Sequence, residues 1–284
     1  MAHPQIAAFA RLAKGGEMPK RLIAGQSTKL SRGVHDIRYD PVHDEIYYSS
    51  IFGQAILVFA GDINGDQPPK RIIQGPKTRY KGTDRLEIDT VHNEIIIPQG
   101  DEILVFPKDA NGDVAPLRIL RGKDTQLRLA GSAVVDPVSN LLIVGLNMPG
   151  SEESRDAGSS KQPPNGALLI FNRTDEGNVK PLRVIKGPIS GITRINQMAV
   201  YSPGKWIVAT QAGEIAEMEP DGVFVGVWNE MDNGDVPPRW KISNSPKSTI
   251  KKPRGVVLDP KHKELIVADM RLNAVLTYYF PEIF

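Results

Sequence analysis

One stretch of twenty residues, 56–75, recurs along the chain and constrains its fold more than any other feature. It reads ILVFAGDINGDQPPKRIIQG, which is an apolar run, a turn rich in Asn and Gly, a proline and a second apolar run. Recognisable copies occupy residues 103–122, 168–187 and 225–242. A degenerate copy lies at 6–25, and only the first half of the stretch recurs at 275–280. Copies at intervals of about 50 residues are typical of repeat architectures.

A second recurring unit lies between these copies. It consists of two β-branched and aliphatic runs around a turn that carries Asp, Pro, Asn or Gly, a pattern that predicts a β-hairpin. The five examples occupy residues 35–50, 84–99, 131–146, 196–211 and 254–269. Each repeat therefore contributes four antiparallel strands, which predicts one blade of a β-propeller.

Because the inner hairpin appears five times, we predict an all-β chain that forms a single-domain propeller of five four-stranded blades over residues 1–284. A six-bladed propeller with one incomplete blade is the alternative. The predicted blades lie at residues 30–75, 80–122, 128–187, 193–243 and 250–284, the last completed by 18–25. The final repeat lacks an outer strand, so we expect Lys20 to Ala24 to pair with Val275 to Phe280 and close the ring. Residues 1–12 form either an extra strand or a short helix.

Residues 147–166 interrupt the period with almost no apolar side chains and many Gly, Pro and Ser residues. This composition predicts a mobile loop within the third blade. Surface loops tolerate insertions at little cost, so drift is one explanation of its length. A lid beside a binding face is the other.

Bulk composition excludes several classes of protein. The chain has 284 residues, 40% hydrophobic and 24% charged, and no apolar run approaches the roughly 18 residues of a membrane span. A net charge of +2 gives no field suited to nucleic acid. With no cysteine, disulfides and thiolate sites are excluded. We expect a soluble monomer without membrane insertion; its compartment stays open, with a secreted or periplasmic location slightly favoured although no signal peptide is visible.

The inner strands resemble those of the NHL-repeat group of bacterial β-propellers. Pro253, Gly255 and Asp259 with residues 265–269 carry the resemblance best, and it extends over nearly the whole chain. The chain departs from the group at the position of Gly255, which in the other blades is Asp36, Arg85, Ser132 and Gln197. The resemblance implies the fold only, because such relatives include protein-binding, RNA-binding and enzymatic propellers.

That departure supplies the candidate site. Residues that enter the inner strands of a propeller surround its central channel, and here they are polar or ionisable in several blades. The predicted ligand-binding residues are His35, Asp36, Asp84, Arg85, Ser132, Asn196, Gln197 and Arg254. Arg38 and Glu87 lie two places further along their strands, so we expect them to face the same channel.

Three interpretations of these residues stay open. One is a structural network of ion pairs around trapped water. Another is a ligand or substrate pocket. The third is a divalent cation held by His35, Asp36, Asp84 and Asn196, which the two arginines oppose. We therefore predict no metal and no cofactor, with Ca²⁺ as the cation to test.

Two other motifs are interpreted as structural. The turns at 61–66, 108–113 and 231–235 resemble calcium loops in their Asp and Asn content but are too short and lack the bidentate Glu. Their Asn-Gly pairs are typical of left-handed turns. His43, His92 and His262 recur at one position of the inner hairpin and are predicted to be solvated turn residues.

The leading functional hypothesis is a non-enzymatic binding scaffold that recognises a protein or a glycan at the central channel face. No nucleophile elbow, P-loop or dinucleotide motif is present. The alternative is a small-molecule hydrolase or lactonase in the channel, with His35 or Asp36 as base and Arg85 or Arg254 holding an anionic substrate.

Overall fold

The structure is a computed structural model that describes residues 4–32, 36–83, 85–147, 166–213, 219, 222–246 and 248–284. The regular elements in these ranges are strands and single 3₁₀ turns, and none is an α-helix. No helix in the described ranges could therefore cross a membrane. The prediction of an all-β chain is confirmed.

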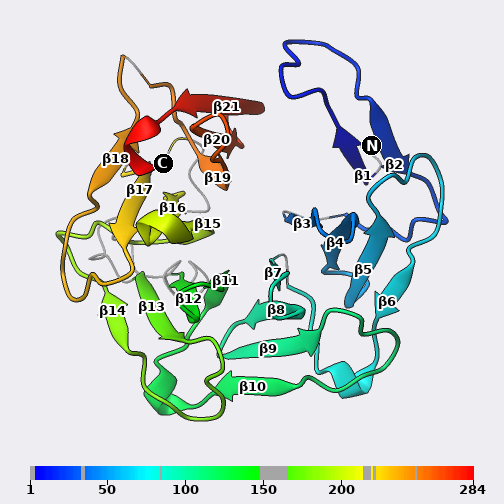
Figure 1. Cartoon of the computed structure of the whole chain (residues 1–284), viewed down its shortest axis with the longest axis horizontal. Helices are drawn as coiled ribbons and strands as arrows, with labels where there is room; N and C mark the ends of the chain where they lie inside the picture. The colour runs from blue at the N-terminus through cyan, green and yellow to red at the C-terminus, as the bar shows by residue number, and fades with distance from the viewer. Residues whose placement is uncertain are drawn as a thin grey trace, which may run out of the picture. The chain divides into compact units, whose positions relative to one another are not determined.

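The five inner hairpins each begin one blade, an antiparallel sheet whose strands follow one another in chain order (Figure 1). The first two blades comprise β3 (Ile37–Asp40), β4 (Glu45–Ser50), β5 (Ala55–Ala60) and β6 (Arg71–Ile73), then β7 (Glu87–Asp89), β8 (Glu94–Gln99), β9 (Glu102–Pro107) and β10 (Arg118–Arg121). The next two comprise β11 (Ala130–Asp136), β12 (Leu141–Leu146), β13 (Ala167–Asn172) and β14 (Arg183–Ile185), then β15 (Ile195–Tyr201), β16 (Trp206–Gln211), β17 (Phe224–Asn229) and β18 (Trp240–Ser243). The prediction of a β-propeller built from five blades is confirmed.

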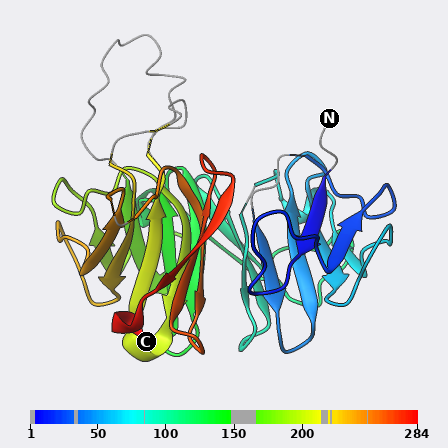
Figure 2. The ribbon, with the colours of Figure 1, turned by 90° about the horizontal axis from the view of Figure 1, so that it is seen from above.

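The fifth blade has three strands among the described residues, namely β19 (Pro253–Asp259), β20 (Glu264–Asp269) and β21 (Ala274–Tyr279). Four short 3₁₀ turns complete the list of elements: η1 (Pro76–Thr78), η2 (Lys123–Thr125), η3 (Ser202–Gly204) and η4 (Pro281–Ile283). Figure 2 shows the strands of each blade running side by side.

The pairing of Lys20 to Ala24 with the last blade stays a prediction, because it would join two separate compact units of the chain. In the structure β2 (Arg21–Ala24) pairs with β1 (Gln5–Ala8) in a sheet of two strands, from Gln5 opposite Ala24 to Ala8 opposite Arg21. The two strands are close in sequence, so their hairpin closes a short loop. This pairing also answers the question left open for residues 1–12, which contain a strand rather than a helix.

The chain divides into two compact units, one of Met1–Ile97 with Leu104–Leu117 and one of Pro98–Ile103 with Arg118–Phe284. The boundary passes through the second blade, within β8 and β9. The single domain over residues 1–284 stays a prediction. The loop predicted at 147–166 lies, apart from its two end residues, outside the described residues.

Within each unit, β2 or the outer strand of a blade bridges to the central turn of the next blade. The parallel bridges join Ile23 to Gly65, Ile73 to Gly112, Leu120 to Gly177 and Ile185 to Gly234. In the first unit Asn111 Oδ1 also accepts from the Ile72 amide at 3.0 Å, and Gly112 has φ of 78°, a value that favours glycine. The prediction that these turns are structural is confirmed, and they serve as clamps between blades.

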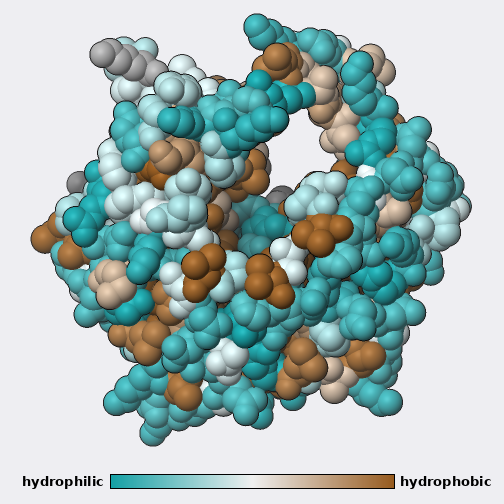
Figure 3. Space-filling model, in the orientation of Figure 1, coloured by the Kyte–Doolittle hydropathy of each residue, from teal (hydrophilic) through white to brown (hydrophobic). Residues whose placement is uncertain are grey.

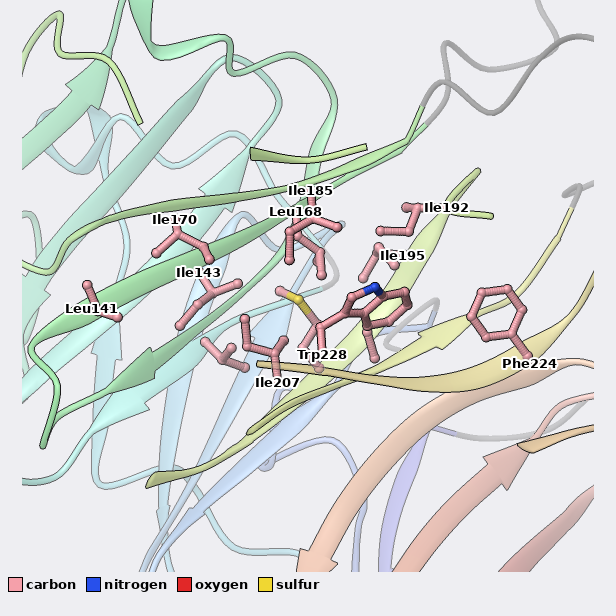
Figure 4. Close-up of a cluster of buried hydrophobic side chains, with 13 residues drawn as sticks. Leu141, Ile143, Leu168, Ile170, Ile185, Ile192, Ile195, Ile207, Phe224 and Trp228 are labelled. Atoms are coloured by element: carbon pink, nitrogen blue, oxygen red, sulfur yellow. The ribbon is translucent and has the colours of Figure 1, made fainter. Parts of the chain in front are cut away.

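Apolar side chains fill the space between neighbouring blades. In the second unit Ile143, Leu168 and Ile185 of the third blade pack with Trp228 of the fourth, and all four are fully buried (Figure 4). Every residue of β12 is buried, which explains why LLIVGL is a continuous apolar run rather than an alternating one. Burying a large apolar side chain stabilises a fold by about 1.5–3 kcal/mol, so these layers hold the blades together.

Candidate functional site

The structure describes six of the eight predicted ligand-binding residues, and it places all six at the starts of inner strands. His35 and Asp84 lie outside the described residues. The first unit holds Asp36 and Arg85, both buried. The second unit holds the others, Ser132, Asn196, Gln197 and Arg254, of which Arg254 is half-buried.

In the first unit a guanidinium joins two carboxylates. Arg38 Nη1 donates to Asp36 Oδ1 at 2.6 Å, and Arg38 Nε donates to Glu87 Oε2 at 3.1 Å. Asp36 stands immediately before β3, Arg38 is in β3, and Glu87 opens β7 of the next blade. Arg38 and Glu87 thus contact each other, and their facing the central channel stays a prediction.

Burial and charge act against each other in this cluster. Burial would lower the pKa of Arg38, but Asp36 and Glu87 together raise it above its ordinary value. Burial raises the pKa of Glu87, although Arg38 opposes that shift. Two carboxyl groups thus share one guanidinium, so the charge of Arg38 is already balanced within the cluster.

Asp36 and Gln197 occupy equivalent places and make equivalent contacts. Gln197 Oε1 accepts from the backbone amide of Val256 at 2.6 Å, and Asp36 Oδ2 lies 3.5 Å from the amide of Leu86. In both cases the amide belongs to the inner strand of the following blade. A side-chain acceptor at this position therefore links two blades. This role is structural and does not depend on a ligand.

The inner strands of the second unit are irregular where the predicted residues lie. The strand registers shift between Ala130 and Ser132, between Ile195 and Met198, and between Pro253 and Gly255. Asn196, Gln197 and Arg254 fall within these β-bulges, which redirect side chains and are frequent beside functional sites.

Ser132 shows how closely these strands pack. A Cβ on Gly145 would lie 2.6 Å from Ser132 Oγ, so β12 needs glycine there. The Ser132 hydroxyl is buried and has no hydrogen-bond partner among the described residues. A buried hydroxyl without a partner is costly and is commonly satisfied by water or ligand, which makes Ser132 the predicted site residue with the clearest capacity to bind.

The repeated histidines belong to turns. His43, His92 and His262 each place Nδ1 beside an aspartate of the same turn, at 2.9, 2.7 and 2.6 Å. Asp259, His262 and Glu264 offer one metal-ligand atom each within 4.8 Å of one another. Because the same Asp–His contact recurs in two other blades, it belongs to the turn, and the predicted structural role is confirmed for these contacts.

The sequence interpretation missed a buried pair of carboxyl groups in the second unit. Asp136 and Glu230 are 0% and 1% exposed. When both carboxyl groups are ionised, neither Asp136 Oδ2 nor Glu230 Oε1 has a hydrogen-bond donor among the described residues. Burial raises the pKa of Glu230 to about 8, and its hydrogen bond with Asp136 acts in the same direction. A proton shared by the pair supplies the missing donor.

The equivalent position in the first unit explains why this pair is unusual. There Lys108 Nζ donates to buried Asp40 Oδ2 at 2.6 Å. Both Lys108 and Glu230 follow directly after the third strand of a blade, and both reach the aspartate that ends the first strand of the preceding blade. The sequence contains one sign of this pair, because the acidic Glu230 stands where another repeat has Lys108.

A surface hollow of about 310 Å³ lies elsewhere in the second unit. Lys241, Lys251 and Glu219 are among its lining residues, and none of the predicted site residues lines it. Lys251 and Arg271 both bond Glu219, at 3.3 and 3.0 Å, so these charges largely satisfy one another. The hollow therefore adds no candidate chemistry.

Comparison with known proteins supports the fold and provides no evidence on function. No family model matches the chain, and no curated protein matches it by sequence, so the NHL resemblance stays a prediction. Of 718 matching chains among solved structures, one is the Kuenenia stuttgartiensis Hydrazine Synthase, with a TM-score of 0.54 and 12% identity. The match covers 83% of this chain and 55% of that one, so the chain spans about half its length. At this identity the likeness shows that the chain shares the β-propeller fold and nothing of its function.

Proposed function

We propose that the protein is a non-enzymatic β-propeller scaffold that binds a protein partner. The observation that carries the proposal is an apolar face of the last blade that no described residue of its own unit covers. Val275 in β21 is 71% exposed, whereas the residues at its position in the other four blades are 0% or 1% exposed. Those residues are Ile56, Ile103, Leu168 and Val225.

The same side of the last blade exposes Val257 and Tyr279. An aliphatic and aromatic surface fits the core of a protein interface better than the hydroxyl-rich surface of a glycan. The view in Figure 3 is mostly hydrophilic, with hydrophobic side chains in small groups. An exposed apolar surface at a position where repeats normally bury one favours a partner.

The hydrolase alternative receives less support from the predicted site. Asp36, its proposed base, already accepts a hydrogen bond from Arg38, so this carboxylate is engaged within the protein. Gln197 is engaged with the next blade. The inner-strand residues thus contribute to joining blades.

The test has a binding arm and a catalytic arm. Affinity enrichment with wild type, Val275→Glu and Val138→Glu should recover proteins that only Val275→Glu loses, because Val138 is equally exposed but lies in a turn of another blade. In the second arm, ester and lactone substrates are assayed with and without Ca²⁺. Saturable turnover that Asp36→Asn abolishes would overturn the proposal in favour of a hydrolase.

A further inference from the structure

A second surface hollow lies within the first unit and has a volume of about 690 Å³. Its described lining residues come from two segments, the turn between β4 and β5 and the segment 74–81 that follows β6. None of them is a predicted ligand-binding residue. Ligand-binding hollows measure about 300–1,000 Å³, so this one is large enough to hold several side chains of a ligand.

Hydrogen bonds between the two segments hold the walls of the hollow in place. Gln74 Nε2 donates to the carbonyl oxygen of Gly53 at 2.7 Å, and Gln54 Nε2 donates to that of Lys81 at 3.4 Å. Both glutamines line the hollow. Walls that are already ordered reduce the entropic cost of binding a ligand.

Tyr80 is the buried member of the lining, with 6% of its surface exposed. Its hydroxyl lies 2.6 Å from Ser49 Oγ of β4 and donates to the carbonyl oxygen of Thr83 at 2.8 Å. The equivalent residues of the next two repeats are Leu127 and Ile192, which have no hydroxyl. The tyrosine therefore gives this repeat an added attachment between the segment 74–81 and the first blade.

Two basic side chains line the hollow, and none of the described lining residues is acidic. Arg79 and Lys81 are both exposed. The nearby acid Asp113 packs against Gly75 without lining the hollow, and its Oδ1 accepts from the amide of Lys77 at 2.7 Å. The lining thus carries positive charge, which is complementary to an acidic ligand.

The hollow of the second unit has a different balance of charge. There Glu219 is one of the lining residues and binds both Lys251 and Arg271. An acid that belongs to the protein thus occupies that hollow, whereas the described lining of the first one offers basic and amide groups.

The exposed walls favour a protein ligand over an enclosed small molecule. Gln54 and Gln74 are exposed, and small-molecule sites usually bury most of their ligand. Because both glutamines donate through Nε2, each keeps Oε1 as an acceptor, which suits the backbone N–H groups of a peptide. Phe52, in the turn between β4 and β5, is 73% exposed, and aromatic residues are enriched in protein interfaces.

We propose that this hollow binds an acidic segment of the protein partner. A carboxylate of the segment binds Arg79 and Lys81, its backbone N–H groups donate to the two glutamines, and an apolar residue beside the acid contacts Phe52. This inference rests on the proposed scaffold function, and it gives the partner a chemistry and a contact on the first unit.

The probe is a fluorescein-labelled hexapeptide, Gly-Leu-Asp-Asp-Leu-Gly, whose anisotropy is titrated with the full chain. The peptide with both aspartates replaced by asparagine should bind about tenfold more weakly, because it lacks the charge-assisted hydrogen bonds. Equal binding of the two peptides would overturn the proposal. Free aspartate that displaces the probe as effectively as the unlabelled peptide would assign the hollow to a small anion and would also overturn it.

A matched pair of variants locates the binding. Arg79→Gln suits the backbone, since Arg79 has φ of 58° and Gln126 holds the equivalent position with φ of 59°. Lys29→Gln removes the same charge from the equivalent turn of the first repeat, where φ is 57°, and Lys29 does not line the hollow. Arg79→Gln should weaken peptide binding about tenfold, and Lys29→Gln should leave it unchanged.

Equal effects of the two variants would mean that net charge alone attracts the peptide, and the proposal would fall. Urea unfolding of both variants checks that the fold is retained. Peptide binding that ignores Arg79→Gln removes this inference and leaves the enrichment test with Val275→Glu standing. Turnover that Asp36→Asn abolishes, together with peptide binding that requires Arg79, removes the non-enzymatic assignment alone.

Discussion

Glu230 faces Asp136 in the second unit at the position where Lys108 faces Asp40 in the first. One repeat therefore pairs a buried carboxylate with a cation, and another pairs it with a second acid. Two buried carboxyl groups cannot both ionise cheaply, so the folded state keeps a proton that the unfolded chain releases.

The first prediction concerns pH. The pKa of Glu230 is raised in the folded state to about 8, so its contribution favours folding at low pH and is lost as pH rises from about 4.5 through 8. In this window the free energy of unfolding of the wild type should fall by up to about 1.4 kcal/mol per pH unit relative to that of Glu230→Gln. Urea unfolding at pH 5.5 to 8.5 measures both, with Glu176→Gln as the exposed control. Identical slopes in wild type and Glu230→Gln would refute the shared proton.

The second prediction tests the inner strands. Gln197→Met retains volume but removes the acceptor for the Val256 amide, and a buried amide left unpaired costs about 1–3 kcal/mol. We expect the free energy of unfolding to fall by that amount in denaturant titrations. Stability unchanged from wild type would show that the contact is dispensable and would favour a ligand role for Gln197.

The third prediction addresses the clamps between blades. Asn111→Ala removes the acceptor for the Ile72 amide and should destabilise the protein by about 1 kcal/mol. Asp109→Ala, an exposed change in the same turn, is the matched control and should have little effect. The prediction fails when the two variants unfold at the same urea concentration.

The fourth prediction concerns acid. The hydrogen bonds from Arg71 lower the pKa of Glu45 to about 2, against the effect of burial. The stability that this depressed pKa represents is present above about pH 4.5 and is lost as pH falls toward 2. Arg71→Met should lower stability at pH 7 and flatten this acid limb. Acid unfolding followed by circular dichroism checks it; an unaltered limb would mean that Lys70 alone holds Glu45 ionised.

The repeated elements were predictable from the sequence because local chemistry determines them. The hairpins around Asp40 and Asp259 follow from alternating aliphatic runs and turn residues, and Asn111-Gly112 follows from the left-handed turn that it forms. These features depend on neighbours in sequence, and five copies allow each to be checked against the others.

The buried acid pair was not predictable in the same way. Asp136 and Glu230 are far apart in sequence, and only the superposition of repeats brings them to one seam. For the candidate site, the clustering of Asp36, Arg38 and Glu87 followed from strand periodicity, whereas the contact of Gln197 with Val256 required coordinates.

Each clamp uses residues of two successive blades only, as when Ile73 meets Gly112. An interface of this kind does not involve more distant repeats. The stability of a repeat array is approximately the sum of the stabilities of its repeats and of the interfaces between neighbours. A duplicated repeat would bring its own central turn and its own outer strand, which are halves of the two clamps on either side of it. The blade is therefore the unit by which the chain can change its length and keep each clamp complete.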